Sequence, residues 1–168
     1  MKVFNETQGF NQWWFRGILL LITAVIIIAM FFVLRDLPSP EPYALWIAIG
    51  SSVIAIALLI GIGFFFKLHT RIDEFGIYYQ FYPFQRSKKL IAWSTIQDCF
   101  VREYKPIREY GGWGYRVKLG RNEKAYNVRG NIGIQIVFKS GKRLLIGTQQ
   151  EDAAKRVLAT YKHKYSTL

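Results

Sequence analysis

The stretch GILLLITAVIIIAMFFVL, residues 17–34, contains no charged side chain, and neither does YALWIAIGSSVIAIALLIGIGFFF, residues 43–66. About 20 consecutive apolar residues in a helix cross the 30 Å hydrocarbon core of a bilayer. Both stretches reach this threshold, whereas helices of a soluble core normally keep a polar face. The sequence therefore predicts two membrane-spanning helices, and the alternative is a pair of buried helices in a soluble protein.

The segments around these stretches fit a hairpin. Residues 35–42 include three prolines, which cannot continue a helix, so they predict a tight connection between antiparallel spans. Trp13, Trp14 and Arg16 are typical of the aromatic and basic belt at a membrane interface, so residues 1–16 are predicted to be an interfacial segment. A cleaved signal peptide is disfavoured, because no small-x-small cleavage site precedes the proline-rich loop.

The net charge of +12 lies in the second part of the chain. The first 66 residues carry three basic and three acidic side chains, whereas the rest carry 20 Lys and Arg against 8 Asp and Glu. Lys2, Arg16, Lys67 and Arg71 flank one side of the predicted hairpin. The positive-inside rule then predicts a multi-pass plasma-membrane protein with both termini cytoplasmic and an extracytoplasmic loop at 35–42.

From residue 67 onward the pattern changes to short alternating segments, which are typical of half-buried strands. Residues 70–74 and 77–82 predict a hairpin, and a later strand has an inner face of Ile132, Ile134, Ile136 and Phe138. About seven antiparallel strands are expected before the pattern becomes helical. The prediction for residues 67–168 is an α+β domain, an antiparallel barrel or sandwich with one C-terminal helix.

The final helix has its own signals. Thr148 and Glu151 match a capping box, with Thr148 as the N-cap. The following apolar stripe consists of Ala154, Val157, Leu158 and Tyr161.

Four segments carry a resemblance to a known family: residues 92–96 (AWSTI), 108–116 (REYGGWGYR), 125–130 (AYNVRG) and 144–149 (LLIGTQ). With the strand order, they make the chain resemble bacterial membrane proteins that carry a pleckstrin-homology-like (PH-like) domain behind a short transmembrane hairpin. The resemblance implies a PH-like fold and a bacterial inner membrane. It supplies no catalytic residues, because that family is largely uncharacterised.

Residues that could carry catalysis do not converge in the sequence. His69 and His163 lie at opposite ends of the domain, and neither has a ligand partner at metal-site spacing. The single cysteine, Cys99, is interpreted as a small buried hydrophobe. Gly111 and its neighbouring glycines lack the Lys-Ser or Lys-Thr of a phosphate loop. We expect no enzyme activity, no cofactor and no metal.

A basic, aromatic-rich stretch between residues 102 and 129 is the candidate binding surface. Such a cluster can also be only a solvated face, and both readings stay open. Near an anionic leaflet each basic residue contributes about 1 kcal/mol of attraction. The candidate ligand-facing residues of this stretch are Tyr110, Trp113, Arg116, Lys118, Arg121, Lys124 and Arg129.

Three functions are compatible with the sequence. The first is a membrane-anchored interaction or scaffold module that docks a protein partner or self-associates. The second is binding or sensing of anionic lipid headgroups through the basic surface. The third, nucleic-acid binding, is not expected, because no recognised motif accompanies the basic charge.

Overall fold

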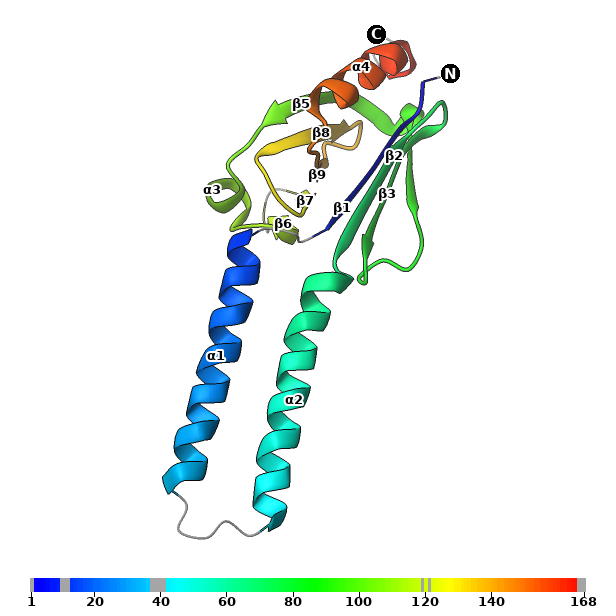
Figure 1. The fold of residues 1–168 in the computed structure, drawn as a ribbon. Helices are drawn as coiled ribbons and strands as arrows, with labels where there is room; N and C mark the ends of the chain where they lie inside the picture. The colour runs from blue at the N-terminus through cyan, green and yellow to red at the C-terminus, as the bar shows by residue number, and fades with distance from the viewer. Residues whose placement is uncertain (1, 10–12, 37–41, 119, 121, 166–168) are drawn as a thin grey trace. The chain divides into compact units, whose positions relative to one another are not determined.

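The computed structural model of the chain describes residues 2–9, 13–36, 42–118, 120 and 122–165. The chain divides into two compact units, one made of Met1–Gly9 with Phe66–Leu168 and the other of Phe10–Phe65. All nine strands of the described residues belong to the first unit, and the two long helices belong to the second (Figure 1).

The helical unit consists of α1 (Trp13–Asp36) and α2 (Pro42–Phe65). The Ser52 hydroxyl donates a hydrogen bond to the Met30 sulfur at 3.1 Å, so the two helices are in contact. Small residues such as Ser52 let helices approach closely. Described apolar side chains of both helices are exposed: Leu20 is 71% exposed and Trp46 is 70% exposed.

The predicted transmembrane hairpin is contradicted. Over the part of the chain that the structure describes, no helix is both long and apolar enough to cross a membrane, a crossing that takes about 20 consecutive residues. This finding overturns the expected spans at 17–34 and 43–66, and with them the multi-pass inner-membrane localisation.

The strand-rich unit contains two sheets, of four and five described strands, which corrects the prediction of an antiparallel barrel or sandwich of about seven strands. The first sheet has the order β1-β2-β3-β4, all antiparallel. Its strands are β1 (Phe4–Gly9), β2 (Lys67–Ile72), β3 (Gly76–Tyr82) and β4 (Lys89–Ala92). A short 3-10 turn, η1 (Trp93–Thr95), follows β4 and leads into the second sheet.

The second sheet has the order β5-β8-β9-β7-β6. Its only parallel pair among the described strands is β7 with β9. The strands are β5 (Ile96–Glu103), β6 (Gly114–Lys118), β7 (Glu123–Asn127), β8 (Ile132–Phe138) and β9 (Arg143–Gly147). The short helix α3 (Pro106–Tyr110) lies between β5 and β6, and α4 (Glu151–Tyr161) with the 3-10 turn η2 (Lys162–Lys164) follows β9.

The hydrophobic core combines side chains from both sheets. In β2, Leu68, Thr70 and Ile72 are buried, and the residues between them face away from the core. Fully buried residues of the second sheet include Ile134, Ile136 and Ile146. The sheets are also joined by polar contact, because Gln85 Nε2 donates to the Tyr126 hydroxyl at 2.9 Å.

The N-terminal segment is a strand, β1, in the stretch predicted to be interfacial. It pairs with β2 along its whole length, as Figure 1 shows. Its buried side chains are Phe4, Glu6 and Gln8. Glu6 accepts hydrogen bonds from Thr148 Oγ1 at 2.6 Å and from the Gln149 backbone N–H at 2.8 Å. These contacts tie the first sheet to the end of β9.

The final helix forms as predicted, but its N-terminus differs. Helix α4 buries the predicted stripe of Ala154, Val157, Leu158 and Tyr161. Its N-cap is Gln150 rather than Thr148, and no side chain caps it. The Thr148 hydroxyl donates to Glu6 and accepts from the Gln150 backbone N–H at 3.1 Å. The Thr148 backbone N–H donates to the Ile132 carbonyl, and Glu151 forms an ion pair with Lys155 at 2.6 Å. The predicted capping box is therefore wrong.

The Glu6 contact predicts a stability effect. Glu6→Gln removes a buried charged acceptor, and we expect it to lower the free energy of unfolding by about 1.5–3 kcal/mol. Urea unfolding of the full chain measures the change. In a Thr148→Val background the same substitution should cost less, because one partner is already gone. An equal cost in both backgrounds would contradict the interaction.

Candidate functional site

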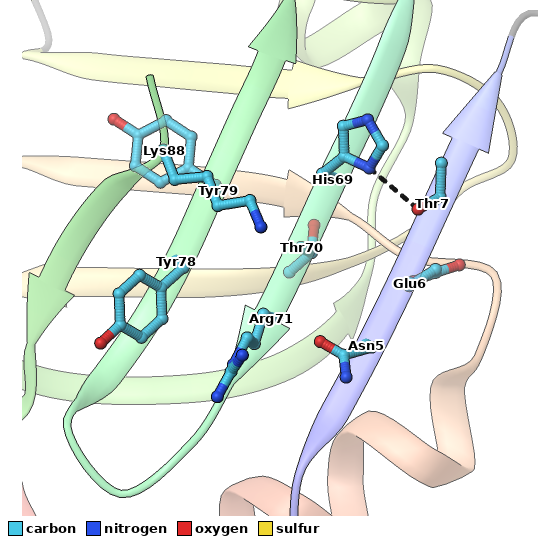
Figure 2. Close-up of a pocket in the computed structure, with 9 residues that line it drawn as sticks. All are labelled: Asn5, Glu6, Thr7, His69, Thr70, Arg71, Tyr78, Tyr79 and Lys88. Carbon is cyan, nitrogen blue, oxygen red and sulfur yellow. Dashed lines mark hydrogen bonds between the residues drawn. The ribbon is translucent and has the colours of Figure 1, made fainter.

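A groove of about 250 Å³ lies on the outer face of the first sheet. Figure 2 shows the residues that line it, which come from β1, β2, β3 and the segment before β4. They are Asn5, Glu6, Thr7, His69, Thr70, Arg71, Tyr78, Tyr79 and Lys88.

Strand alternation explains which side chains can face this groove. In β2 the buried residues are Leu68, Thr70 and Ile72, so His69 and Arg71 face outward. In β1 the exposed Asn5 and Thr7 alternate with buried residues. The register sets Thr7 opposite His69, Asn5 opposite Arg71, and Arg71 opposite Tyr78.

Three contacts position the basic side chains of β2. Thr7 Oγ1 and His69 Nδ1 form a hydrogen bond at 2.9 Å, drawn as the dashed line in Figure 2. Arg71 Nε donates to Asp73 Oδ2 at 3.0 Å, and the Arg71 guanidinium lies 5.9 Å from the centre of the Tyr78 ring. The Arg71 side chain is still 50% exposed. The Arg71 side chain is therefore held in place and is still accessible to a ligand.

Arg71 and Lys88 contribute positive charges to the groove, and the charge of Arg71 is paired with that of Asp73. The carboxylate of Glu6 is engaged on the inner face by Thr148 and Gln149. The pKa of His69 is lowered by partial burial and then by the positive charges of Lys88 and Lys67. Burial is the larger cause, and the two lysines add to it because a second positive charge beside them is disfavoured.

The groove places a hydroxyl, Thr7 Oγ1, beside the imidazole of His69. A hydroxyl beside an imidazole can act as a nucleophile and base, but such a pair needs a group that orients the base. No contact with a carboxylate is found for His69 among the described residues. The described residues also contain no group of three or more His, Cys, Asp or Glu that could hold a metal. Cys99 is buried, and burial raises its pKa far above the ordinary value.

Of the predicted site residues, two are involved in internal contacts. Tyr110 is buried in α3, and its hydroxyl donates to Glu123 Oε1 at 2.9 Å. That contact and burial raise the pKa of the Tyr110 hydroxyl above its ordinary range. Trp113 is partly buried, and its indole N–H donates to the Gly130 carbonyl at 3.0 Å.

The predicted basic residues do not share one face. On β6, Arg116 stands opposite Ala125 of β7, and Val117 stands opposite Lys124, so Arg116 and Lys118 lie on one face of the sheet and Lys124 on the other. Arg129 is exposed in the turn after β7. Arg121 lies outside the described residues, and the side chains of Trp13, Trp14 and Arg16 are not among those described.

Sequence reasoning missed His69, Arg71 and Lys88 as a group. The alternation of Lys67, His69 and Arg71 was the available signal, since three basic residues two apart must share one face of a strand. Because β1 was not predicted, however, a groove on that face could not be expected.

Comparisons of the chain with protein-family models, curated proteins and solved structures gave no match. The resemblance to PH-like bacterial membrane proteins therefore stays a prediction.

The electrostatics predict a change in the titration of His69. Lys88→Ala removes a neighbouring cation, so we expect the pKa of His69 to rise towards its ordinary value. Lys89→Ala, the adjacent exposed lysine, is the matched control and should leave this pKa where it is. Histidine ring signals followed by NMR across pH measure both. A His69 pKa that does not respond to Lys88→Ala would contradict the described electrostatics.

Proposed function

We propose that this chain is a non-enzymatic binding module that holds a phosphate-bearing ligand in the groove on its first sheet. The observation that carries the proposal is the gathering of Arg71, Lys88 and His69 around one hollow, with the neighbouring carboxylate of Glu6 engaged on the opposite face.

The donors suit a tetrahedral oxyanion. Arginine binds phosphate oxygens through pairs of N–H groups, and lysine supplies a point charge. The ion pair of Arg71 with Asp73 uses Nε, at 3.0 Å from Asp73 Oδ2. The side chains of Asn5, Thr7 and Tyr78 add neutral donors around the same hollow.

The source of the phosphate can be a soluble compound or a lipid headgroup, since both present the same chemistry. Lipid binding was expected at Arg116, Lys118, Arg121, Lys124 and Arg129, but Arg116 and Lys118 lie on one face of the second sheet and Lys124 lies on the other. The groove on the first sheet supports anion binding better, because its cations lie around a single hollow.

Calorimetric titration of the full chain with inorganic phosphate tests the proposal. Arg71→Ala and Lys88→Ala should each weaken binding roughly tenfold, which corresponds to about 1.4 kcal/mol. Lys139→Ala, at an exposed position in the turn after β8, is the control and should bind as the unchanged chain does. Absence of binding, or equal weakening by all three variants, would contradict the proposal.

Binding to lipid vesicles distinguishes a lipid headgroup from a soluble phosphate compound. If the ligand is a lipid headgroup, the full chain should bind vesicles of phosphatidylcholine with phosphatidic acid. The Lys88→Ala variant should then bind them less. If the ligand is soluble, inorganic phosphate binds and the chain does not float with either these vesicles or pure phosphatidylcholine.

Binding should also depend on pH through His69. Protonation adds a positive charge to the groove, so affinity for sulfate should rise as the pH falls through the pKa of His69, a pKa lowered by burial and by Lys88 and Lys67. Sulfate keeps its charge in this range, whereas phosphate does not. In the His69→Gln variant the affinity for sulfate should be independent of pH. If the affinity still depends on pH, another group causes that dependence.

A further inference from the structure

A second binding feature lies on the other sheet, at strand β6. In the order β5-β8-β9-β7-β6 it stands at the edge, and among the described strands it pairs only with β7. An edge strand presents backbone N–H and C=O groups that an additional strand can pair with. Its sequence, Gly114 to Lys118, contains no proline that would remove a donor.

One face of β6 is apolar and incompletely covered. Tyr115 and Val117 belong to this face, and they are 37% and 47% exposed. The Tyr115 ring stacks on Tyr126 at a centroid distance of 4.9 Å and contacts the Phe84 ring at 6.4 Å. Phe84 is itself 64% exposed. Alternate side chains of a strand face the same side of a sheet. Every second side chain of a strand added beside β6 would therefore cover this aromatic surface.

The opposite face of β6 carries two basic side chains, Arg116 and Lys118. Lys118 stands opposite Glu123 of β7, whose carboxylate accepts a hydrogen bond from the Tyr110 hydroxyl, whereas Arg116 stands opposite Ala125. Neither basic side chain forms an ion pair within the described residues. The positive charge of Lys118 acts on Glu109 of α3, where it helps to lower the carboxyl pKa after the larger effect of the hydrogen bond from Arg102. Both basic side chains could therefore face acidic residues of an added strand.

Charge decides which strand fits. If two copies of β6 paired antiparallel about a two-fold axis at Arg116, the two arginines would stand opposite each other, and like charges in that position are destabilising. Basic side chains on edge strands generally prevent such self-pairing. We infer that β6 docks an extended segment of another protein in which acidic residues alternate with apolar ones.

Fluorescence polarisation with defined peptides tests this. The probe is a labelled eight-residue peptide alternating valine with glutamate, and the matched peptide alternates valine with lysine. The full chain should bind the glutamate peptide at least tenfold more tightly. The double variant Arg116→Glu with Lys118→Glu should reverse that preference.

The matched control is Lys139→Glu with Lys142→Glu, which makes the same change in net charge at the exposed β8–β9 turn. It should keep the preference of the unchanged chain. An equal affinity for both peptides, or an equal loss in the control, would overturn the inference. So would undiminished binding of a glutamate peptide whose backbone nitrogens are methylated at alternate positions, since strand pairing needs those donors.

Peptide binding at β6 can be tested separately from phosphate binding in the groove. Lys88→Ala should bind the glutamate peptide as the unchanged chain does, and Arg116→Glu with Lys118→Glu should retain phosphate binding. Loss of peptide binding on Lys88→Ala would place the peptide in the groove and overturn docking at β6.

Discussion

The strand-rich unit depends on how the N-terminal strand is held. β1 pairs with β2 over Phe4 to Gly9, and the buried carboxylate of Glu6 accepts hydrogen bonds from Thr148 and Gln149 at the end of β9. Two polar groups buried with good partners stabilise a structure, whereas either one alone would destabilise it. The Tyr161 hydroxyl of α4 adds a bond to the Lys2 carbonyl at 2.7 Å. The same strand forms one wall of the groove, so the fold and the candidate site share a constraint.

The two proposed binding features arise from the different positions of two strands. β2 lies inside its sheet, so its backbone is fully paired and only its outward side chains, His69 and Arg71, can recognise a ligand. β6 is at an edge, so its backbone can take part in recognition together with its side chains. Side-chain recognition suits a compact anion, and backbone pairing suits an extended chain. A module with both could bind a phosphate-bearing ligand and a protein partner at separate places.

The sequence predicted what apolar periodicity can reveal. β8 and the buried stripe of α4 lie where their patterns indicated. β1 was missed because two of its three inward residues, Glu6 and Gln8, are polar, so the segment shows no apolar alternation. The capping box failed because the Thr148 N–H donates to the Ile132 carbonyl and Glu151 pairs with Lys155, while the Thr148 hydroxyl donates to Glu6. Glu6 is 142 positions away, so no local pattern can include it. The two uncharged stretches suggested membrane spans, which the described helices do not support.

Hydrogen exchange of residues 4–9 tests the central claim most directly, because the claim is that this segment is a paired strand of the folded unit. In the full chain without ligand, we expect the backbone amides of β1 to exchange slowly and to be protected about as well as those of β2. Exchange of residues 4–9 at the rate of an unfolded peptide, with β2 still protected, would contradict it. The groove would then lack the wall that Asn5 and Thr7 provide.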